Sequence, residues 1–159
     1  MEAYVTAASL LAFLAAAAVV DLRTRRIPNL LTISAAIVGL LLNLSWRGGH
    51  GAVASGVGLL AGLAAFLPFY IAGGFGAGDV KAMAAVGAFL GPKGALLAAA
   101  WTLLVGGVAA LGVLAALRWK AARASDGWRL GEARRQRFPY GLAIACGTAL
   151  YLGWSRVYG

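Results

Sequence analysis

Six apolar stretches, almost free of charged residues, occupy most of the chain and limit what it can fold into. They are residues 3–20, 30–44, 52–72, 80–91, 94–117 and 140–155. Charged residues make up only 12% of the chain, whereas a soluble domain has roughly a quarter. This is too little charge to cover a surface that faces water. The sequence therefore predicts an integral membrane protein, and it excludes a soluble globular enzyme, a disordered chain and a free nucleic-acid-binding protein.

The apolar stretches are predicted to be helices rather than barrel strands. Lipid offers no hydrogen-bond partners, so a spanning backbone must satisfy its own polar groups in helices or in a closed barrel. Runs of alanine and leucine without alternation exclude the barrel. We therefore expect an all-α polytopic membrane protein with six transmembrane helices, forming a single domain over residues 1–159. The motifs Gly58-x-x-x-Gly62 and Gly87-x-x-x-Gly91 fit close helix packing, although 23 glycines make such matches frequent.

The orientation in the membrane follows from where the basic residues lie. A cleaved signal peptide carries positive charge before its apolar run, whereas here Arg23, Arg25 and Arg26 follow the first stretch. We therefore expect an uncleaved first helix with its N-terminus outside. The fourth stretch is short, about 20 Å as a helix, for a hydrocarbon core of about 30 Å. If it crosses, eleven Lys and Arg residues lie inside and three outside. This distribution fits the positive-inside rule and favours six crossings of the cell inner (cytoplasmic) membrane.

The longest polar segment, residues 118–139, carries seven basic residues. We interpret it as a cytosolic loop that lies on anionic lipid, with a substrate-docking loop as the alternative. The net charge of +9 resembles that of a nucleic-acid-binding protein. In so apolar a chain arginine more often marks topology, so no nucleic-acid partner is expected. One cysteine, Cys146, and one histidine, His50, leave no basis for a disulfide framework or a metal site, and no cofactor is expected.

Two acidic residues border the apolar stretches, where an ionisable group marks a candidate functional site. Asp21 follows the first stretch and Asp79 precedes the fourth, so the predicted topology places both at the cytosolic edge, although 58 positions separate them. Two neighbouring carboxylates can share a proton, one acting as a general base for water and the other as a general acid. The simpler alternatives are a helix cap for Asp79 and an interfacial ion pair with Arg23 or Arg25 for Asp21.

The residues around each aspartate favour the catalytic interpretation. Gly76 and Gly78 precede Asp79, and glycines there let the backbone approach an extended substrate peptide closely. Pro28 interrupts the chain between the first two helices. Lys81 is expected to hold Asp79 ionised, to bind a substrate carboxylate, or simply to extend its amine to the membrane surface.

In these two segments the chain resembles the type IV prepilin peptidases, a family of GxGD membrane aspartyl proteases. That family carries an aspartate followed six residues later by Ile-Pro-Asn, and a second aspartate within Gly-x-Gly-Asp-x-Lys. The matching residues are Asp21 with Ile27, Pro28 and Asn29, and Gly76, Gly78, Asp79 and Lys81. The resemblance implies that Asp21 and Asp79 are catalytic and that they cleave a short leader from pilin-like or preflagellin-like precursors at the cytosolic face. The chain lacks the cysteine-bearing insertion of larger members. It therefore resembles the compact, peptidase-only form found in tight-adherence pilus systems or in preflagellin processing, and N-methyltransferase activity is not expected.

A small membrane transporter or channel is the alternative function. In such a protein Asp21 and Asp79 would form a proton or cation site. Changing either carboxylate to an amide would abolish both functions, so a leader-cleavage assay on purified protein is needed to separate them. Two other membrane proteases are excluded, because the sequence contains neither Gly-x-Ser-Gly nor His-Glu-x-x-His.

Overall fold

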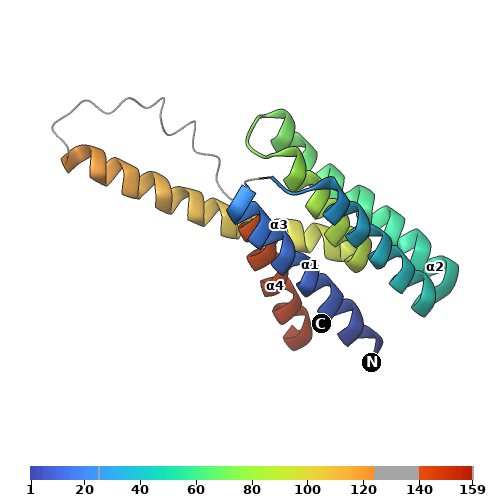
Figure 1. The fold of residues 1–159 in the computed structure, drawn as a ribbon. Helices are drawn as coiled ribbons and strands as arrows, with labels where there is room; N and C mark the ends of the chain where they lie inside the picture. The colour runs from blue at the N-terminus through green and yellow to red at the C-terminus, as the bar shows by residue number, and fades with distance from the viewer. Residues whose placement is uncertain (25, 124–139, 159) are drawn as a thin grey trace.

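The computed structural model describes residues 1–24, 26–123 and 140–158, and within these ranges it contains helices and no strand. The helices are α1 (Glu2–Thr24), α2 (Asn29–Ile71), α3 (Ala77–Arg123) and α4 (Tyr140–Tyr158) (Figure 1). Three segments are long and apolar enough to cross a membrane: α1, α2 and the Ala77–Val113 part of α3. The all-α prediction is therefore confirmed.

Helices α2 and α3 are each broken by a glycine with a positive φ angle. Gly48 has φ 59° and Gly91 has φ 72°, a backbone region that residues with a Cβ rarely adopt. A straight α2 of 43 residues would be about 65 Å long, twice the thickness of a bilayer core. Figure 1 shows instead that α2 runs outward and folds back beside itself. The predicted stretches 30–44 and 52–72 are thus the two arms of α2, and stretches 80–91 and 94–117 both belong to α3.

Side chains from α2 satisfy the backbone groups that the break in α3 leaves open. Pro92 follows the break and has no N–H, so the Ala88 carbonyl loses its helical partner. The Ser55 hydroxyl donates to the Ala88 oxygen at 2.7 Å, and the Asn43 amide nitrogen donates to the same oxygen at 3.0 Å. The Asn43 amide also reaches the Phe89 oxygen at 3.1 Å. Helix α2 therefore stabilises the break inside an apolar environment that offers no other partners.

The second arm of α2 and the first arm of α3 lie backbone to backbone. A Cβ at Gly58 would collide with the Gly87 carbonyl, and a Cβ at Gly87 would collide with the Gly58 carbonyl. One turn along, a Cβ at Gly62 would collide with the Met83 carbonyl. The two Gly-x-x-x-Gly motifs therefore contact each other, as close packing of such motifs requires. This contact fixes the short helical arm that begins near Asp79.

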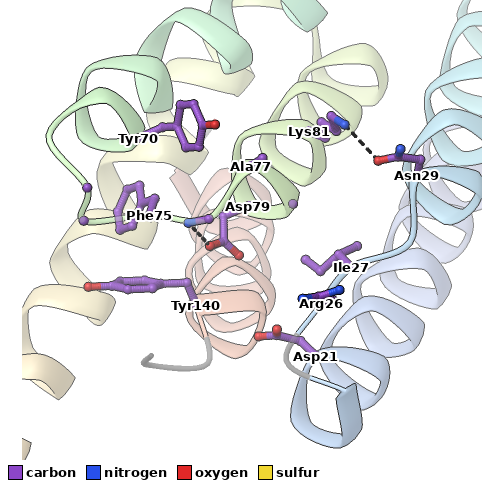
Figure 2. Close-up of a pocket in the computed structure, with 14 residues that line it drawn as sticks. Asp21, Arg26, Ile27, Asn29, Tyr70, Phe75, Ala77, Asp79, Lys81 and Tyr140 are labelled. Atoms are coloured by element: carbon purple, nitrogen blue, oxygen red, sulfur yellow. Dashed lines mark hydrogen bonds between the residues drawn. The ribbon is translucent and has the colours of Figure 1, made fainter. Parts of the chain in front are cut away.

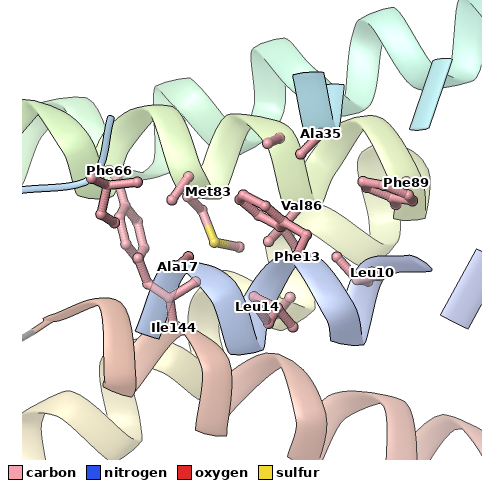
Figure 3. Close-up of a cluster of buried hydrophobic side chains, with 14 of the residues drawn as sticks. Leu10, Phe13, Leu14, Ala17, Ala35, Phe66, Met83, Val86, Phe89 and Ile144 are labelled. Atoms are coloured by element: carbon pink, nitrogen blue, oxygen red, sulfur yellow. The ribbon is translucent and has the colours of Figure 1, made fainter. Parts of the chain in front are cut away.

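The core lies where α1, the first arm of α3 and α4 meet, beneath the end of α2 (Figure 3). Its large buried side chains come from all four helices and include Leu10, Phe13, Leu14, Phe66, Met83, Val86, Phe89 and Ile144. Many other large apolar side chains point outward: Leu60 and Leu104 are 62% exposed, and Val108 is 70% exposed. A surface of this kind is costly in water and suits contact with lipid.

The predicted basic loop begins as a helix. Helix α3 continues through Arg118 to Arg123, so residues 118–123 extend the helix that precedes the loop, and Figure 1 shows this end projecting away from the other helices. The remainder of the predicted loop, residues 124–139, lies outside the described residues.

Candidate active site

A cavity of about 700 Å³ opens where several chain segments meet at one end of the helices (Figure 2). Its walls come from the end of α1, linker residues 26 and 27, both ends of α2, the loop at 73–76, and the first residues of α3 and α4. Segments that are far apart in the sequence therefore line one cavity. Two of its lining residues, Asp21 and Asp79, are buried carboxylates, 6% and 8% exposed.

The structure brings both predicted aspartates to this cavity, although they lie on different helices. Asp21 is in the last turn of α1 and Asp79 is in the first turn of α3. Among the described residues, no group of three or more His, Cys, Asp or Glu side chains gathers as a metal site would require. Asp21 and Asp79 therefore come from two different helices to line one cavity.

Asp79 is held by the start of its own helix. The Gly76 backbone N–H donates to Asp79 Oδ2 at 2.9 Å, and the Asp79 N–H donates to the Gly76 oxygen at 3.1 Å. This reciprocal arrangement resembles a capping box, in which the third helical residue reaches back to the residue before the helix. The Asp79 side chain therefore caps the start of α3 and lines the cavity at the same time.

Asp21 is held by a different element, the start of α4. The Gly141 backbone N–H donates to Asp21 Oδ2 at 2.9 Å, across 120 positions of sequence. Gly141 is the second residue of α4, where backbone N–H groups have no partner within the helix. Sequence reasoning did not select Gly141, and the ion-pair interpretation of Asp21 does not account for this contact.

Gly78 packs inside the protein as well as lining the cavity. A Cβ at position 78 would lie 3.2 Å from the Ile27 Cβ and 3.4 Å from the Ile27 nitrogen. The expectation was that this glycine leaves room for a substrate peptide. The structure shows that it leaves room for Ile27, which is itself 7% exposed. The two sequence motifs therefore meet through this contact.

Lys81 joins the two motifs at the mouth of the cavity. Its ammonium donates to Asn29 Oδ1 at 2.8 Å, and the side chains of both residues are exposed (Figure 2). Lys81 therefore contacts the start of α2 rather than Asp79. Pro28 is the exposed residue that precedes α2, with extended backbone angles of φ −63° and ψ 141°. Its ring ends the linker at the point where α2 begins.

With this geometry established, comparison with known proteins identifies the chain's relatives. Residues 8–111 match the sequence model of the type IV leader peptidase family. The chain belongs to the type IV leader peptidase family. Searches of curated proteins and of solved structures returned no significant match. Membership implies a membrane protease with substrates of the prepilin type, and the matched region contains both aspartates.

Three aromatic residues that sequence reasoning missed also line the leader peptidase cavity: Tyr70, Phe75 and Tyr140. The Phe75 ring meets the Tyr140 ring edge to face, with centroids 4.4 Å apart, a geometry that adds to the energy of simple burial. Phe75 also contacts Phe66 and Phe69 of α2. These contacts tie the glycine-rich loop to α4 beside Asp79. No motif predicted them, because they join aromatic residues from three separate segments.

Proposed function

We propose that the protein is an aspartic endopeptidase that removes the short leader from pilin-like or preflagellin-like precursors. The observation that carries this proposal is the placement of two buried carboxylates, Asp21 and Asp79, in one cavity. Membership of a leader peptidase family supports it independently. No metal ion or cofactor takes part in the proposed chemistry.

The two carboxylates suit the addition of water to a peptide bond. In each aspartate a backbone N–H binds Oδ2, and among the described residues no hydrogen bond occupies Oδ1. The ionised carboxyl takes a proton from water as the water oxygen attacks the scissile carbonyl carbon. At the same time the protonated carboxyl donates its proton to the carbonyl oxygen. When the tetrahedral intermediate collapses, the carboxyl that took the proton from water passes it to the departing amine, and the other carboxylate takes the proton of a hydroxyl group as the carbonyl re-forms. The pair then holds one shared proton again.

The proposed topology has six crossings, the N-terminus outside and the cavity at the cytosolic face of the inner membrane. The breaks in α2 and α3 at Gly48 and Gly91 support it, because they divide the four helices into six helical segments. The distribution of Lys and Arg supports it too, with eleven inside and three outside. The segment 118–139 would rest on anionic lipid, and the substrate would keep its own apolar helix in the bilayer.

The test is cleavage of a purified precursor by purified enzyme in lipid vesicles. Asp21→Asn and Asp79→Asn should each abolish cleavage, and the double variant should be no worse, because the pair acts as one unit. Asparagine keeps an oxygen that can accept the N–H of Gly141 or Gly76, so both variants should insert and fold. Near-normal cleavage by either variant would refute the mechanism. Proton flux through vesicles without any cleavage would favour the transporter alternative.

A further inference from the structure

We propose that Gly141 is a positioning residue for Asp21, and that its main-chain N–H sets where this carboxylate lies in the cavity. The inference rests on the proposed function, since it assigns the group that orients one of the two catalytic aspartates. The protein already provides the contact: the Gly141 N–H donates to Asp21 Oδ2 at 2.9 Å, and both residues are buried.

The position of Gly141 in α4 makes its N–H a strong donor. It lies in the first turn of a 19-residue helix, where the N–H groups point away from the helix with no internal partner. The aligned peptide dipoles also give this end a partial positive charge, which favours a nearby carboxylate. Asp21 therefore supplies an acceptor that the start of α4 lacks, and in return α4 holds one oxygen of the carboxylate.

The same contact explains why position 141 is a glycine. A Cβ there would lie 2.8 Å from Asp21 Oδ2, 2.8 Å from the Asp21 Cβ and 3.0 Å from its Cγ. The two separations of 2.8 Å are shorter than carbon atoms in folded proteins tolerate, so something must shift. Since Asp21 lines the cavity, the space open to its side chain lies on the cavity side. Any larger residue at 141 would displace the carboxylate from its present place.

The two aspartates differ in how far along the sequence their backbone N–H donors lie. Asp79 is bound by Gly76, three residues before it, so its orientation is a local property of the start of α3. Asp21 is bound by a helix 120 positions later. The backbone of α1 also packs more extensively against α4 than against α2 or α3. The separation of the two carboxylates is therefore set where α1 meets α4, and Gly141 occupies that contact.

The experiment compares two identical substitutions in one helix. Gly141→Ala places a methyl group against Asp21, whereas Gly153→Ala, also in α4, places one where no atom lies within 4 Å. Because a displacement of about 1 Å can cost about 100-fold in rate, we expect Gly141→Ala to lower kcat for precursor cleavage by about 10- to 100-fold. KM for the precursor should stay within about threefold, since the change acts on the chemical step rather than on substrate binding. Gly153→Ala should match the wild type.

A second measurement shows whether the effect passes through Asp21. Gly141→Ala should lower the thermal unfolding temperature of the parent protein, but not that of an Asp21→Gly background, which has no side chain to collide with. If Gly141→Ala alone fails to accumulate, the Asp21→Gly/Gly141→Ala double variant should accumulate again. Failure of that rescue would overturn the inference.

Other outcomes separate this inference from the proposed function. Normal kcat in Gly141→Ala, with Asp21→Asn inactive, would refute the positioning role and leave the protease mechanism intact. A raised KM with unchanged kcat would also overturn it, because Gly141 would then contact substrate instead of Asp21. Active Asp21→Asn would refute the proposed function, and the positioning role would fall with it.

Discussion

The break in α3 provides a quantitative test of how α2 stabilises the fold. Ser55 is 1% exposed, and its hydroxyl donates to the Ala88 carbonyl oxygen at 2.7 Å. Side-chain hydrogen bonds inside membrane proteins contribute about 0.6 kcal/mol on average and about 1.7 at most. Ser55→Ala leaves the Asn43 bond to the same oxygen at 3.0 Å. We therefore expect this variant to lower the free energy of unfolding by about 1 kcal/mol.

Asn43→Ala should cost more, because the Asn43 amide donates to the carbonyl groups of Ala88 and Phe89 in α3, as well as to Gly39 one turn earlier in its own helix. It removes a second donor from Ala88 and a donor, at 3.1 Å, from Phe89. An acceptor left without a partner in a buried place costs about 1–3 kcal/mol, so we expect a loss of about 2 kcal/mol for this variant. In the double variant with Ser55→Ala, the Ala88 oxygen has neither donor. The combined loss should exceed the sum of the single losses by about 1 kcal/mol.

The assay is equilibrium unfolding in mixed micelles, followed by circular dichroism. The matched control is Ser45→Ala in the same helix, since Ser45 is exposed and its hydroxyl contacts only the Leu41 oxygen one turn earlier. This control should change stability little. If Ser55→Ala were no worse than Ser45→Ala, or if the double variant were simply additive, the carbonyl at Ala88 would not depend on these two donors and the account of the break would be wrong.

Two further predictions concern the cavity. Gly78→Val should reduce cleavage far more than Lys81→Met, because the branched side chain would press on Ile27, whereas Lys81 is exposed and bonds only to the exposed Asn29 side chain. Cleavage rates measured at equal protein concentration test this order, and the reverse order would mean that the two roles are assigned wrongly. In a Cys146→Ser background, a cysteine at the exposed, cavity-lining position 77 should react with a charged thiol reagent supplied from the cytosolic side, and one at exposed position 50 only from the other side. Reaction of position 77 from the outside alone would invert the topology and rule out cytosolic cleavage.

The two aspartates could be predicted because charge is scarce in this chain. An ionisable residue beside an apolar stretch is costly, so Asp21 and Asp79 stand out without any structure. The counting of Lys and Arg then placed them on one side of the membrane. Gly141 could not be found in this way, because its contribution is a main-chain N–H, which every residue except proline carries. Only the three-dimensional packing of α1 on α4 makes that group different from the others.

The glycines also show how much sequence spacing alone can reveal about contacts in the folded protein. With 23 in the chain, spacing alone could not distinguish Gly58, whose added Cβ would strike α3, from Gly56, which has no atom within 4 Å. Gly78 was predicted to face the substrate, and its close neighbour is Ile27. The sequence therefore predicts where glycine is required within a motif better than it predicts which atoms require it.

The hydrogen bond from α4 to Asp21 also has a consequence for biogenesis. Helix α4 is synthesised after the other three helices, and it provides both the donor to Asp21 and the Tyr140 wall of the cavity. A nascent chain that has inserted α1 to α3 therefore holds both carboxylates but lacks the part that orients the first of them. Proteolytic competence should appear only when the last helix joins the others in the membrane. Under the proposed mechanism, the order of translation keeps the enzyme latent until its insertion is complete.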